Sequence, residues 1–254
     1  MRVATWNVER PKNGASPRSQ RILAQIREVA ADLWILTETH DAIRPGPGYH
    51  AASTPTVPAA PIHHDEGEHK TTIWSRWPIV EQWETATPHR ATCAIVETPL
   101  EEMAIYGTVL PYHAARWPYG TPRNWDAHYA AIAIQGADWS RLRRKYPAHG
   151  FCVAGDLNQT RTGRLWYGSK WGRALLDLAL KENNLVGVTQ ADFSAARQLP
   201  AEDQELLIRC IDHICLDRRW TKLVRRIGIW PNETAGGEYL SDHSGVFVDL
   251  ATGE

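Results

Sequence analysis

The sequence predicts an α+β domain in which two mixed β-sheets pack face to face and helices lie on the outside. Three observations lead to this fold class. The chain has 254 residues, the size of one large domain. Strands and helices follow one another in two successive halves, and each half contains a helix that connects strands. No linker separates the halves, so we expect residues 1–254 to form a single domain.

The composition excludes several classes of protein. Hydrophobic residues make up 43% of the chain and charged residues 22%, which is ordinary for a globular protein. The net charge of −1 and the pI of 6.8 argue against a broad polyanion binder but leave room for a local basic groove. No apolar run approaches the length of about 18 residues that a membrane span needs.

The first elements are a strand, a helix and a second strand. The opening strand covers 2–8. Ser16-Pro17 is typical of a helix start, with serine as the N-cap and proline in the first turn. Apolar residues then recur at helical spacing, which predicts a helix over 17–31. The continuous apolar run at 33–37 is typical of a buried central strand.

A long surface loop and a group of short strands follow. Residues 44–69 are rich in proline, alanine, histidine and glycine, which predicts the loop. Short strands are expected at 70–75, 79–86, 91–97 and 103–110. A loop over 111–121 ends in Thr121-Pro122, a second helix start, and the helix covers 122–145.

The last part of the chain repeats this mixture. A strand is expected at 150–154, and leucines at helical spacing predict a helix over 171–181. Further strands complete the domain near 185–188, 208–216, 222–230 and 245–250.

The cysteines and the N-terminus indicate a compartment. Four cysteines lie in apolar or alternating stretches without metal-binding spacing: Cys93, Cys152, Cys210 and Cys215. We therefore predict reduced, mostly buried thiols. The first strand begins almost at once, without a basic and apolar leader, so we expect a cytoplasmic protein.

Polar residues interrupt apolar strands at their ends in five places. These are Asn7 with Glu9, Glu38, Asp156 with Asn158, Asp212, and Asp242 with His243. One acid at a strand end usually marks a solvated turn, but five such places are harder to dismiss. If they converge, they supply oxygen ligands for Mg²⁺ or Mn²⁺, a carboxylate that can take a proton from water, and an imidazole that can face a phosphoryl oxygen.

Six short motifs occur in one order along the chain. They are Thr-Trp-Asn-Val (5–8), Leu-Thr-Glu-Thr (36–39), Ile-Trp-Ser-Arg-Trp-Pro-Ile (73–79), Gly-Asp-Leu-Asn (155–158), Ile-Asp-His-Ile (211–214) and Ser-Asp-His (241–243). With them the chain resembles the endonuclease/exonuclease/phosphatase superfamily, which has the fold of pancreatic deoxyribonuclease and the abasic-site endonucleases. The resemblance extends over essentially the whole chain and implies a four-layer α/β/β/α sandwich.

The resemblance implies a metal site. Glu38 matches the principal metal-binding glutamate of the family, and Asn7 matches the asparagine beside it. Glu9 and Asp242 are expected to add to this site, and the implied cofactor is Mg²⁺ or Mn²⁺.

The resemblance also implies a catalytic set. Asp156 matches the aspartate that orients or deprotonates the attacking water, and Asn158 matches the residue that helps to hold the phosphate and the water. His243 matches the histidine that hydrogen-bonds the scissile phosphate. Asp212 matches the aspartate that fixes the tautomer of that ring.

The sequence departs from the family at one phosphate ligand. Relatives often carry a tyrosine or histidine near the end of the strand expected at 103–110, where this chain has Val109. Tyr112 or His113, just beyond that strand, could substitute. The aromatic signature of abasic-site endonucleases and the extra motif of inositol polyphosphate phosphatases are not visible, so we assign no subfamily.

Cations and aromatic residues alternate over 161–171, directly after Gly-Asp-Leu-Asn. Arg161, Arg164 and Trp166 suit a strand of nucleic acid, with phosphates on the arginines and bases stacked on the ring. The alternative interpretation is that the tryptophans wedge this loop against the core and the cations are solvated.

The leading hypothesis is a divalent-metal-dependent phosphodiester hydrolase, a monomeric nuclease that cleaves DNA or RNA. The near-neutral pI keeps an alternative open, a phosphatase or phosphodiesterase of a small or lipid-derived phosphoester such as an inositol phosphate. A third hypothesis is an inactive binding module on the same fold. The joint presence of so many site residues argues against it, because a scaffold has no need of clustered acids at the edge of its core.

Overall fold

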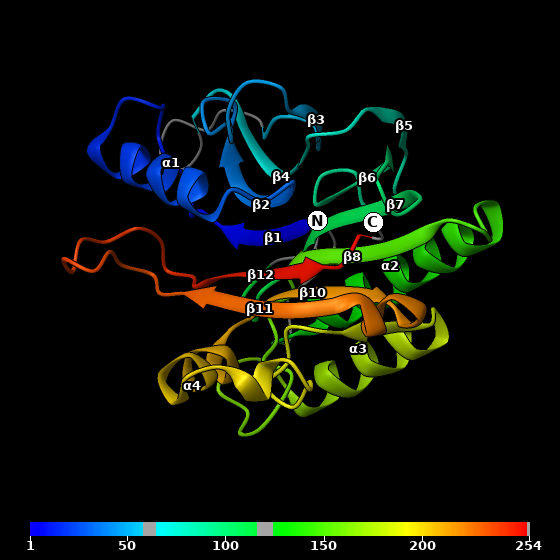
Figure 1. Ribbon diagram of the computed structural model, residues 1–254. Helices are drawn as coiled ribbons and strands as arrows, with labels where there is room; N and C mark the ends of the chain where they lie inside the picture. Colours follow the sequence, from blue (N-terminus) through cyan, green and yellow to red (C-terminus); the bar gives the residue numbers. More distant parts are fainter. Residues whose placement is uncertain (58–64, 116–123, 253–254) are drawn as a thin grey trace.

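The computed structural model describes residues 1–57, 65–115 and 124–252. Within them, two six-stranded β-sheets pack face to face, and helices lie on the outer face of each sheet (Figure 1). This arrangement confirms the four-layer α/β/β/α sandwich. No helix of the described residues is both long enough and apolar enough to cross a membrane.

The first sheet joins strands from both ends of the chain, in the order β11-β12-β1-β2-β4-β3. Its strands are β1 (Arg2–Asn7), β2 (Leu33–His40), β3 (His50–Ser53), β4 (Glu68–Ser75), β11 (Val224–Trp230) and β12 (Gly245–Leu250). β1 pairs parallel to β2, and the other neighbours pair antiparallel. The last of these strands along the chain therefore lies beside the first.

The second sheet is built from the middle of the chain, in the order β5-β6-β7-β8-β10-β9. Its strands are β5 (Ile79–Trp83), β6 (Ala91–Glu97), β7 (Glu102–Val109), β8 (Gly150–Asp156), β9 (Leu185–Gly187) and β10 (Asp212–Asp217). Here β7 and β8 are parallel, and the other pairs are antiparallel.

Helices cover both outer faces. α1 (Pro17–Val29) packs on the first sheet, while α2 (Asp126–Lys145) and α3 (Lys170–Glu182) pack on the second. α4 (Ala201–Arg209) contacts β11. Two short 3₁₀ helices, η1 (Ala196–Gln198) and η2 (Arg218–Leu223), flank it along the chain.

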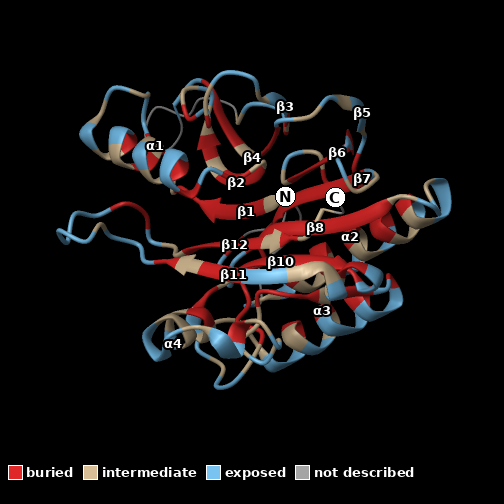
Figure 2. Ribbon diagram, in the orientation of Figure 1, coloured by how far each residue is buried: buried red, intermediate tan, exposed pale blue. Residues whose placement is uncertain are grey.

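The core follows the two-residue period of extended chain. On β2, Leu33 and Ile35 lie between the sheets, whereas Trp34 and Leu36 lie under α1. Figure 2 shows the resulting pattern, with the central strands buried, part of the edge strand β11 exposed, and the helices exposed on their outer sides. The central strands of each sheet are therefore buried on both faces, whereas the edge strands β5 and β11 expose charged residues such as Glu81 and Arg225.

The sequence places two elements incorrectly. It predicts a strand over 208–216, but β10 begins only at Asp212 because α4 runs to Arg209. The apolar run Leu206-Leu207-Ile208 fits a strand or a helix, and only Leu207 of α4 is buried. The region 44–69, predicted as a loop, contains β3 and the start of β4.

The start of α1 is defined by a side-chain cap. Ser16 caps α1 as predicted, because its side chain accepts a hydrogen bond from the N–H of Ser19. The helix predicted over 122–145 is described from Asp126 as α2, and Thr121-Pro122 lies outside the described residues. The four cysteines are free and buried, as predicted.

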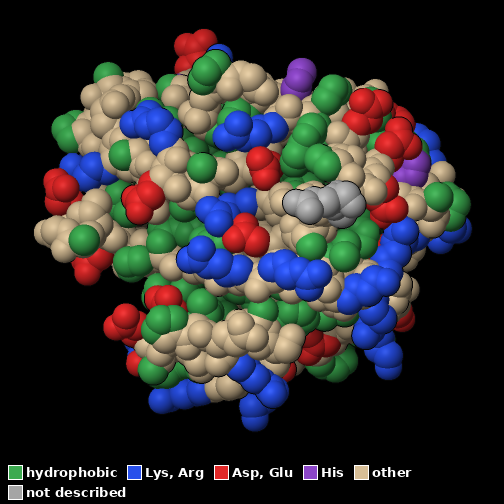
Figure 3. All heavy atoms as spheres, in the orientation of Figure 1, with side chains coloured by type: hydrophobic (Ala, Val, Ile, Leu, Met, Phe, Trp, Pro, Cys, Tyr) green, Lys and Arg blue, Asp and Glu red, His purple; other side chains and the backbone are tan. Residues whose placement is uncertain are grey.

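Basic side chains gather over β11 and β12 on the face shown in Figure 3. Arg225 and Arg226 of β11 are exposed there. The guanidinium groups of Arg2 and Arg226 lie 4.1 and 5.4 Å from the ring centre of Phe247, and Arg2 also pairs with Asp249. These contacts give the surface a structural role.

Candidate active site

The strand ends predicted to carry the chemistry meet at one edge of the sandwich. β8 ends at Asp156, which lies opposite Asp212, the first residue of antiparallel β10. β1 ends at Asn7, and His243 stands just before β12, the antiparallel neighbour of β1. Asp156 continues the inward-facing positions of β8, since Cys152 and Ala154 both lie between the sheets.

Asn7 links the two sheets. Its backbone N–H donates to Asp212 Oδ1 at 2.9 Å, and its side-chain Nδ2 donates to Asp156 Oδ2 at 3.2 Å. All three residues are buried. The amide therefore fixes the two carboxyl groups relative to each other across the sheet–sheet interface.

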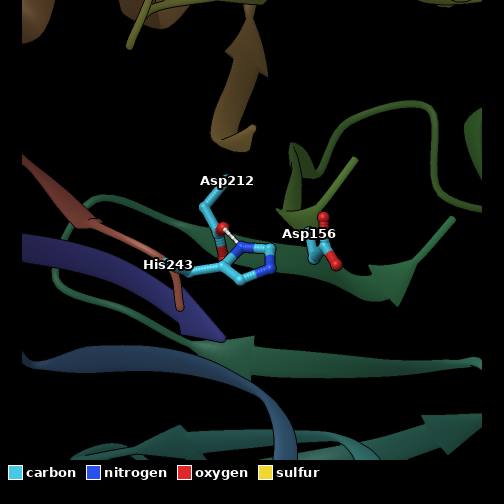
Figure 4. A group of neighbouring side chains, drawn as sticks. All are labelled: Asp156, Asp212 and His243. Atoms are coloured by element: carbon cyan, nitrogen blue, oxygen red, sulfur yellow. Dashed lines mark hydrogen bonds and ion pairs between the residues drawn. The ribbon is translucent and has the colours of Figure 1, made fainter. Parts of the chain in front are cut away.

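His243 lies between these two carboxyl groups (Figure 4). Its Nδ1 is 2.5 Å from Asp212 Oδ2, and one ligand atom from each of Asp156, Asp212 and His243 lies within 4.8 Å of the others. The bond to Asp212 fixes the orientation of the ring and leaves Nε2 for a substrate.

Burial and charge act in opposite directions on His243. Burial lowers the pKa of the imidazole, but the carboxylates of Asp212 and Asp156 outweigh burial and raise that pKa to about 10. The ring is therefore an imidazolium at neutral pH. A fixed cation at this point suits the negative charge of a phosphoryl oxygen.

Asp156 is poised to change protonation near neutral pH. Burial raises the pKa of its carboxyl to about 7; His243 opposes this rise, and Asp212 adds to it. The N–H and the Nδ2 of Asn158 donate to the two oxygens of Asp156, at 2.9 and 2.8 Å. Asn158 also donates to the carbonyl of Leu110 at 2.9 Å, so the carboxyl group is held at both oxygens.

Glu38 faces the same cavity from β2. Lys70 of β4 donates to its Oε1 at 3.1 Å, and Arg10 Nε lies 3.4 Å from its Oε2. Burial raises the pKa of the Glu38 carboxyl, but Lys70 and Arg10 outweigh burial and lower it. Glu38 and Asn158 both adopt left-handed backbone (φ 47° and 48°), which non-glycine residues rarely do and which is common at functional sites.

These side chains line one cavity of about 590 Å³. Its wall consists of Asn7, Arg10, Glu38, Lys70, Tyr112, Asp156, Asn158, Tyr167, Ile211, Asp242 and His243. The structure thus brings together six of the predicted catalytic and metal-binding residues, and Asp212 is bonded to His243 from outside this wall. Asp242 stands at the mouth, with Oδ1 3.7 Å from His243 Nε2 and a half-exposed side chain.

Glu9 lies elsewhere. Its Oε2 accepts hydrogen bonds from Arg18 Nη2 at 2.8 Å and from Tyr239 Oη at 2.7 Å. Arg18 also donates to the carbonyl of Leu240, a few residues before His243. Glu9 therefore ties β1 to α1 and to the loop that carries the histidine.

Of the residues predicted to contact substrate, some line the cavity and others do not. Tyr112 lines the cavity, whereas His113 packs against the ring of Trp125 and lies 3.4 Å from Tyr167 Oη. Arg161 is buried, with Nη2 2.6 Å from Asp177 of α3. Arg161 therefore directs its charge to Asp177 and does not line the cavity beside which the phosphate contact was expected.

Arg164 and Trp166 remain at the surface beside the cavity. The Arg164 guanidinium lies 4.6 Å from the Trp166 ring centre, and Arg209 of α4 lies 4.5 Å from it. Trp166 is 45% exposed. The Trp166 ring is therefore held between two cations at the surface, and it contributes little to the core.

Sequence reasoning overlooked Lys70, Tyr167 and Arg209. Lys70 begins an expected strand, and Tyr167 lies inside the stretch of alternating cations and rings, so both positions carried a weak signal. Arg209 belongs to α4, which was predicted as strand.

The fold and the site together define a class, the hydrolases that act on phosphoester bonds. The chain belongs to the Endonuclease/Exonuclease/phosphatase family, whose model matches residues 4–243. No curated protein matches the sequence.

Several solved structures share the fold at low identity. An AP endonuclease from Archaeoglobus fulgidus is 12% identical, with a TM-score of 0.66 over 98% of this chain and 99% of that one. The 3′ phosphatase from Neisseria, bound to a product DNA hairpin, is 17% identical, with a TM-score of 0.64 over 99% of both chains. The human nocturnin catalytic domain with bound sulfate is also 17% identical, with a TM-score of 0.65 over 100% of this chain and 94% of that one.

The donor set fits a divalent cation. Glu38 and Asp156 offer the carboxylate oxygens that hard cations prefer. Asp242 adds a further carboxylate to the wall of the same cavity. Members of this family typically use divalent metals.

Proposed function

We propose that this protein is a divalent-metal-dependent phosphodiester hydrolase that cleaves DNA or RNA. One observation carries the proposal: a buried carboxyl with a pKa near 7 lies beside an imidazolium that an aspartate holds in place, in a cavity of about 590 Å³. This is the combination that hydrolysis of a phosphoester requires, a base for water and a cation for the phosphoryl oxygen.

His243 and Asp212 act together in this scheme. The imidazolium donates from Nε2 to a non-bridging phosphoryl oxygen, and Asp212 keeps the proton on Nδ1. Asp156 accepts a proton from the attacking water, because a base with a pKa near the working pH combines availability with driving force. The carboxamide of Asn158 holds Asp156 and adds a polar group next to the water.

Glu38 is the principal metal ligand in the proposal. The Nδ1 of His243 and Asp212 are already bonded to each other, so the acids on the Glu38 side of the cavity, with Asp242 at its mouth, are better placed to hold Mg²⁺ or Mn²⁺. When bound, the ion supplies Lewis-acid stabilisation of negative charge on oxygen. Lys70, which donates to Glu38 Oε1, lines the same cavity and would add a positive charge for the phosphate.

Two observations support nucleic acid as the substrate. The cavity opens beside Trp166 and its two arginines, which provide a ring and cations at the surface. The similar structure from Neisseria is bound to a DNA hairpin. The near-neutral charge keeps a small or lipid-derived phosphoester as the second candidate.

A substrate panel tests the function. The purified protein is assayed with Mg²⁺ or Mn²⁺ on duplex DNA, single-stranded DNA, RNA, inositol phosphates and a generic diester, with EDTA as the metal control. We expect nucleic acid cleavage that EDTA abolishes. Asp156→Asn should lower kcat by about 10²–10³-fold, whereas the exposed Asp192→Asn should not. Turnover of inositol phosphates alone would replace the proposal with the second candidate.

A further inference from the structure

A second cavity of about 390 Å³ adjoins the catalytic one. The two cavities share part of their walls: Tyr167, Ile211, Asp242 and His243 line both. A group in the second cavity is therefore adjacent to whatever His243 contacts. Its volume lies in the lower part of the range for small-molecule sites, about 300–1,000 Å³.

The wall of this cavity combines a flat aromatic surface with aliphatic and polar groups. Trp166 and Tyr167 contribute rings, Leu206 and Ile211 contribute aliphatic side chains, and Asn232 contributes an amide. The amide offers both a donor and an acceptor. Such a wall suits a planar ring with polar edges.

Trp166 is positioned by its neighbours before any ligand arrives. Arg164 comes from the same loop and Arg209 comes from α4, and both guanidinium groups lie within 4.6 Å of the ring centre. Arg209 also forms an ion pair with exposed Glu205. Because the ring is fixed yet 45% exposed, its placement serves little core packing.

The side chains of α4 also contribute more to this cavity than to the core. It buries only Leu207 in the core, while Leu206 and Arg209 line the second cavity. The helix therefore has one side chain that anchors it and others that shape this wall.

We propose that the second cavity is a base pocket, which binds the nucleobase of the nucleotide whose phosphate is held at His243. The inference rests on the proposed function and names the part of the substrate that the site recognises. The base stacks against the Trp166–Tyr167 wall, and Asn232 bonds its polar edge. Arg164 and Arg209 lie where a neighbouring phosphate of the strand can reach them.

Binding of ligands with and without a base tests the base pocket. In isothermal titration calorimetry with Mg²⁺, 5′-AMP and 3′-AMP are compared with ribose 5-phosphate, which has the sugar and phosphate without a base. We expect at least one AMP isomer to bind about 5- to 100-fold more tightly than ribose 5-phosphate, the range that stacking of one base provides. Trp166→Ala should remove this preference, and Trp166→Phe should keep part of it.

Trp171→Ala is the control, because Trp171 is 61% exposed and lies outside both cavities. It should keep the full preference. Equal binding of AMP and ribose 5-phosphate, or equal effects of the two tryptophan variants, would overturn the base pocket. Nuclease activity would then still support the proposed function. A preference for AMP without any nucleic acid cleavage would keep the pocket and reject the nuclease.

Discussion

Two glutamates near the ends of parallel strands have different surroundings. Glu38 faces the cavity between Lys70 and Arg10, whereas Glu9 turns to Arg18 and Tyr239. The sequence shows an acid at a strand end in both cases. The difference comes from partners on α1 and on the loop before β12, and these partners are far away in the sequence.

We therefore expect Glu38→Gln and Glu9→Gln to differ in metal dependence. Glu38→Gln removes a charged ligand and should raise the Mg²⁺ concentration for half-maximal activity at least tenfold. Glu9→Gln should leave that concentration unchanged and lower stability by about 1 kcal/mol, since it weakens a partly exposed ion pair and a tyrosine hydrogen bond. Activity titrations against Mg²⁺ and thermal melts measure the two effects. An equal shift in Mg²⁺ requirement would return Glu9 to the metal site.

The residue scale also shows what sequence reasoning can recover. The acids, amide and imidazole at strand ends were predictable because strand ends in a packed sandwich are the places where polar groups stay satisfied. The burial of Arg161 was not predictable, because it depends on the ion pair with Asp177 of α3. Burial of a long cation is a property of the folded partner, which local composition does not encode.

The imidazolium of His243 should make stability depend on pH. The pKa rises from 6.5 in the unfolded chain to about 10 in the fold, so the ion pair with Asp212 stabilises fully below pH 6.5 and is lost as pH rises through 10. The free energy of unfolding of wild type relative to His243→Gln should fall by about 1 kcal/mol or more across this range. Denaturant titrations at several pH values measure the difference. A difference that stays constant or grows with pH would contradict the ion pair.

At the scale of elements, hydrophobic periodicity predicts most helices and strands, but it assigns one helix as a strand and misses one short strand. Helices with a cap and a long apolar stripe, such as α1 and α3, were predictable. α4 was not, because an apolar run of three residues carries no period and its helical state depends on docking near β11. β3 was missed because it is a four-residue edge strand with half of its residues exposed.

Adjacent leucines on α4 should separate stability from substrate binding. Leu207 is 1% exposed and packs in the main core, so Leu207→Ala should destabilise the protein by about 2–5 kcal/mol. Leu206 lines the base pocket, so Leu206→Ala should cost less than about 1 kcal/mol but raise KM for nucleic acid several-fold. Denaturant unfolding and steady-state kinetics give the two readouts. Similar losses of stability would show that Leu206 belongs to the core.

At the scale of the whole molecule, the two-sheet arrangement was predictable from the order of elements. The pairing of β12 with β1 was not, because nothing in either strand specifies its neighbour. The same pairing brings His243 to Asp212 of the other sheet. Convergence of the site is therefore a consequence of topology, which spacing along the chain cannot show.

The distribution of charge should determine how strongly the affinity for duplex DNA depends on salt concentration. With a net charge of −1, we expect binding of duplex DNA to depend on the cations beside the base pocket. Each phosphate contact adds about 0.9 to the slope of log affinity against log salt, so Arg164→Gln with Arg209→Gln should lower that slope by about 2. The control is Arg218→Gln with Arg225→Gln. Both residues are exposed, and they lie after the end of β10 and near the start of β11, away from the strand ends that form the site. Equal changes in slope would place the DNA over β11 instead.

The insertion of β12 between β11 and β1 has a consequence for synthesis on the ribosome. Nearly every other part of the site is translated before His243, yet the histidine takes its place only when this late strand docks. A nascent chain in which β12 has not yet docked therefore lacks the imidazolium that the folded chain holds between Asp212 and Asp156.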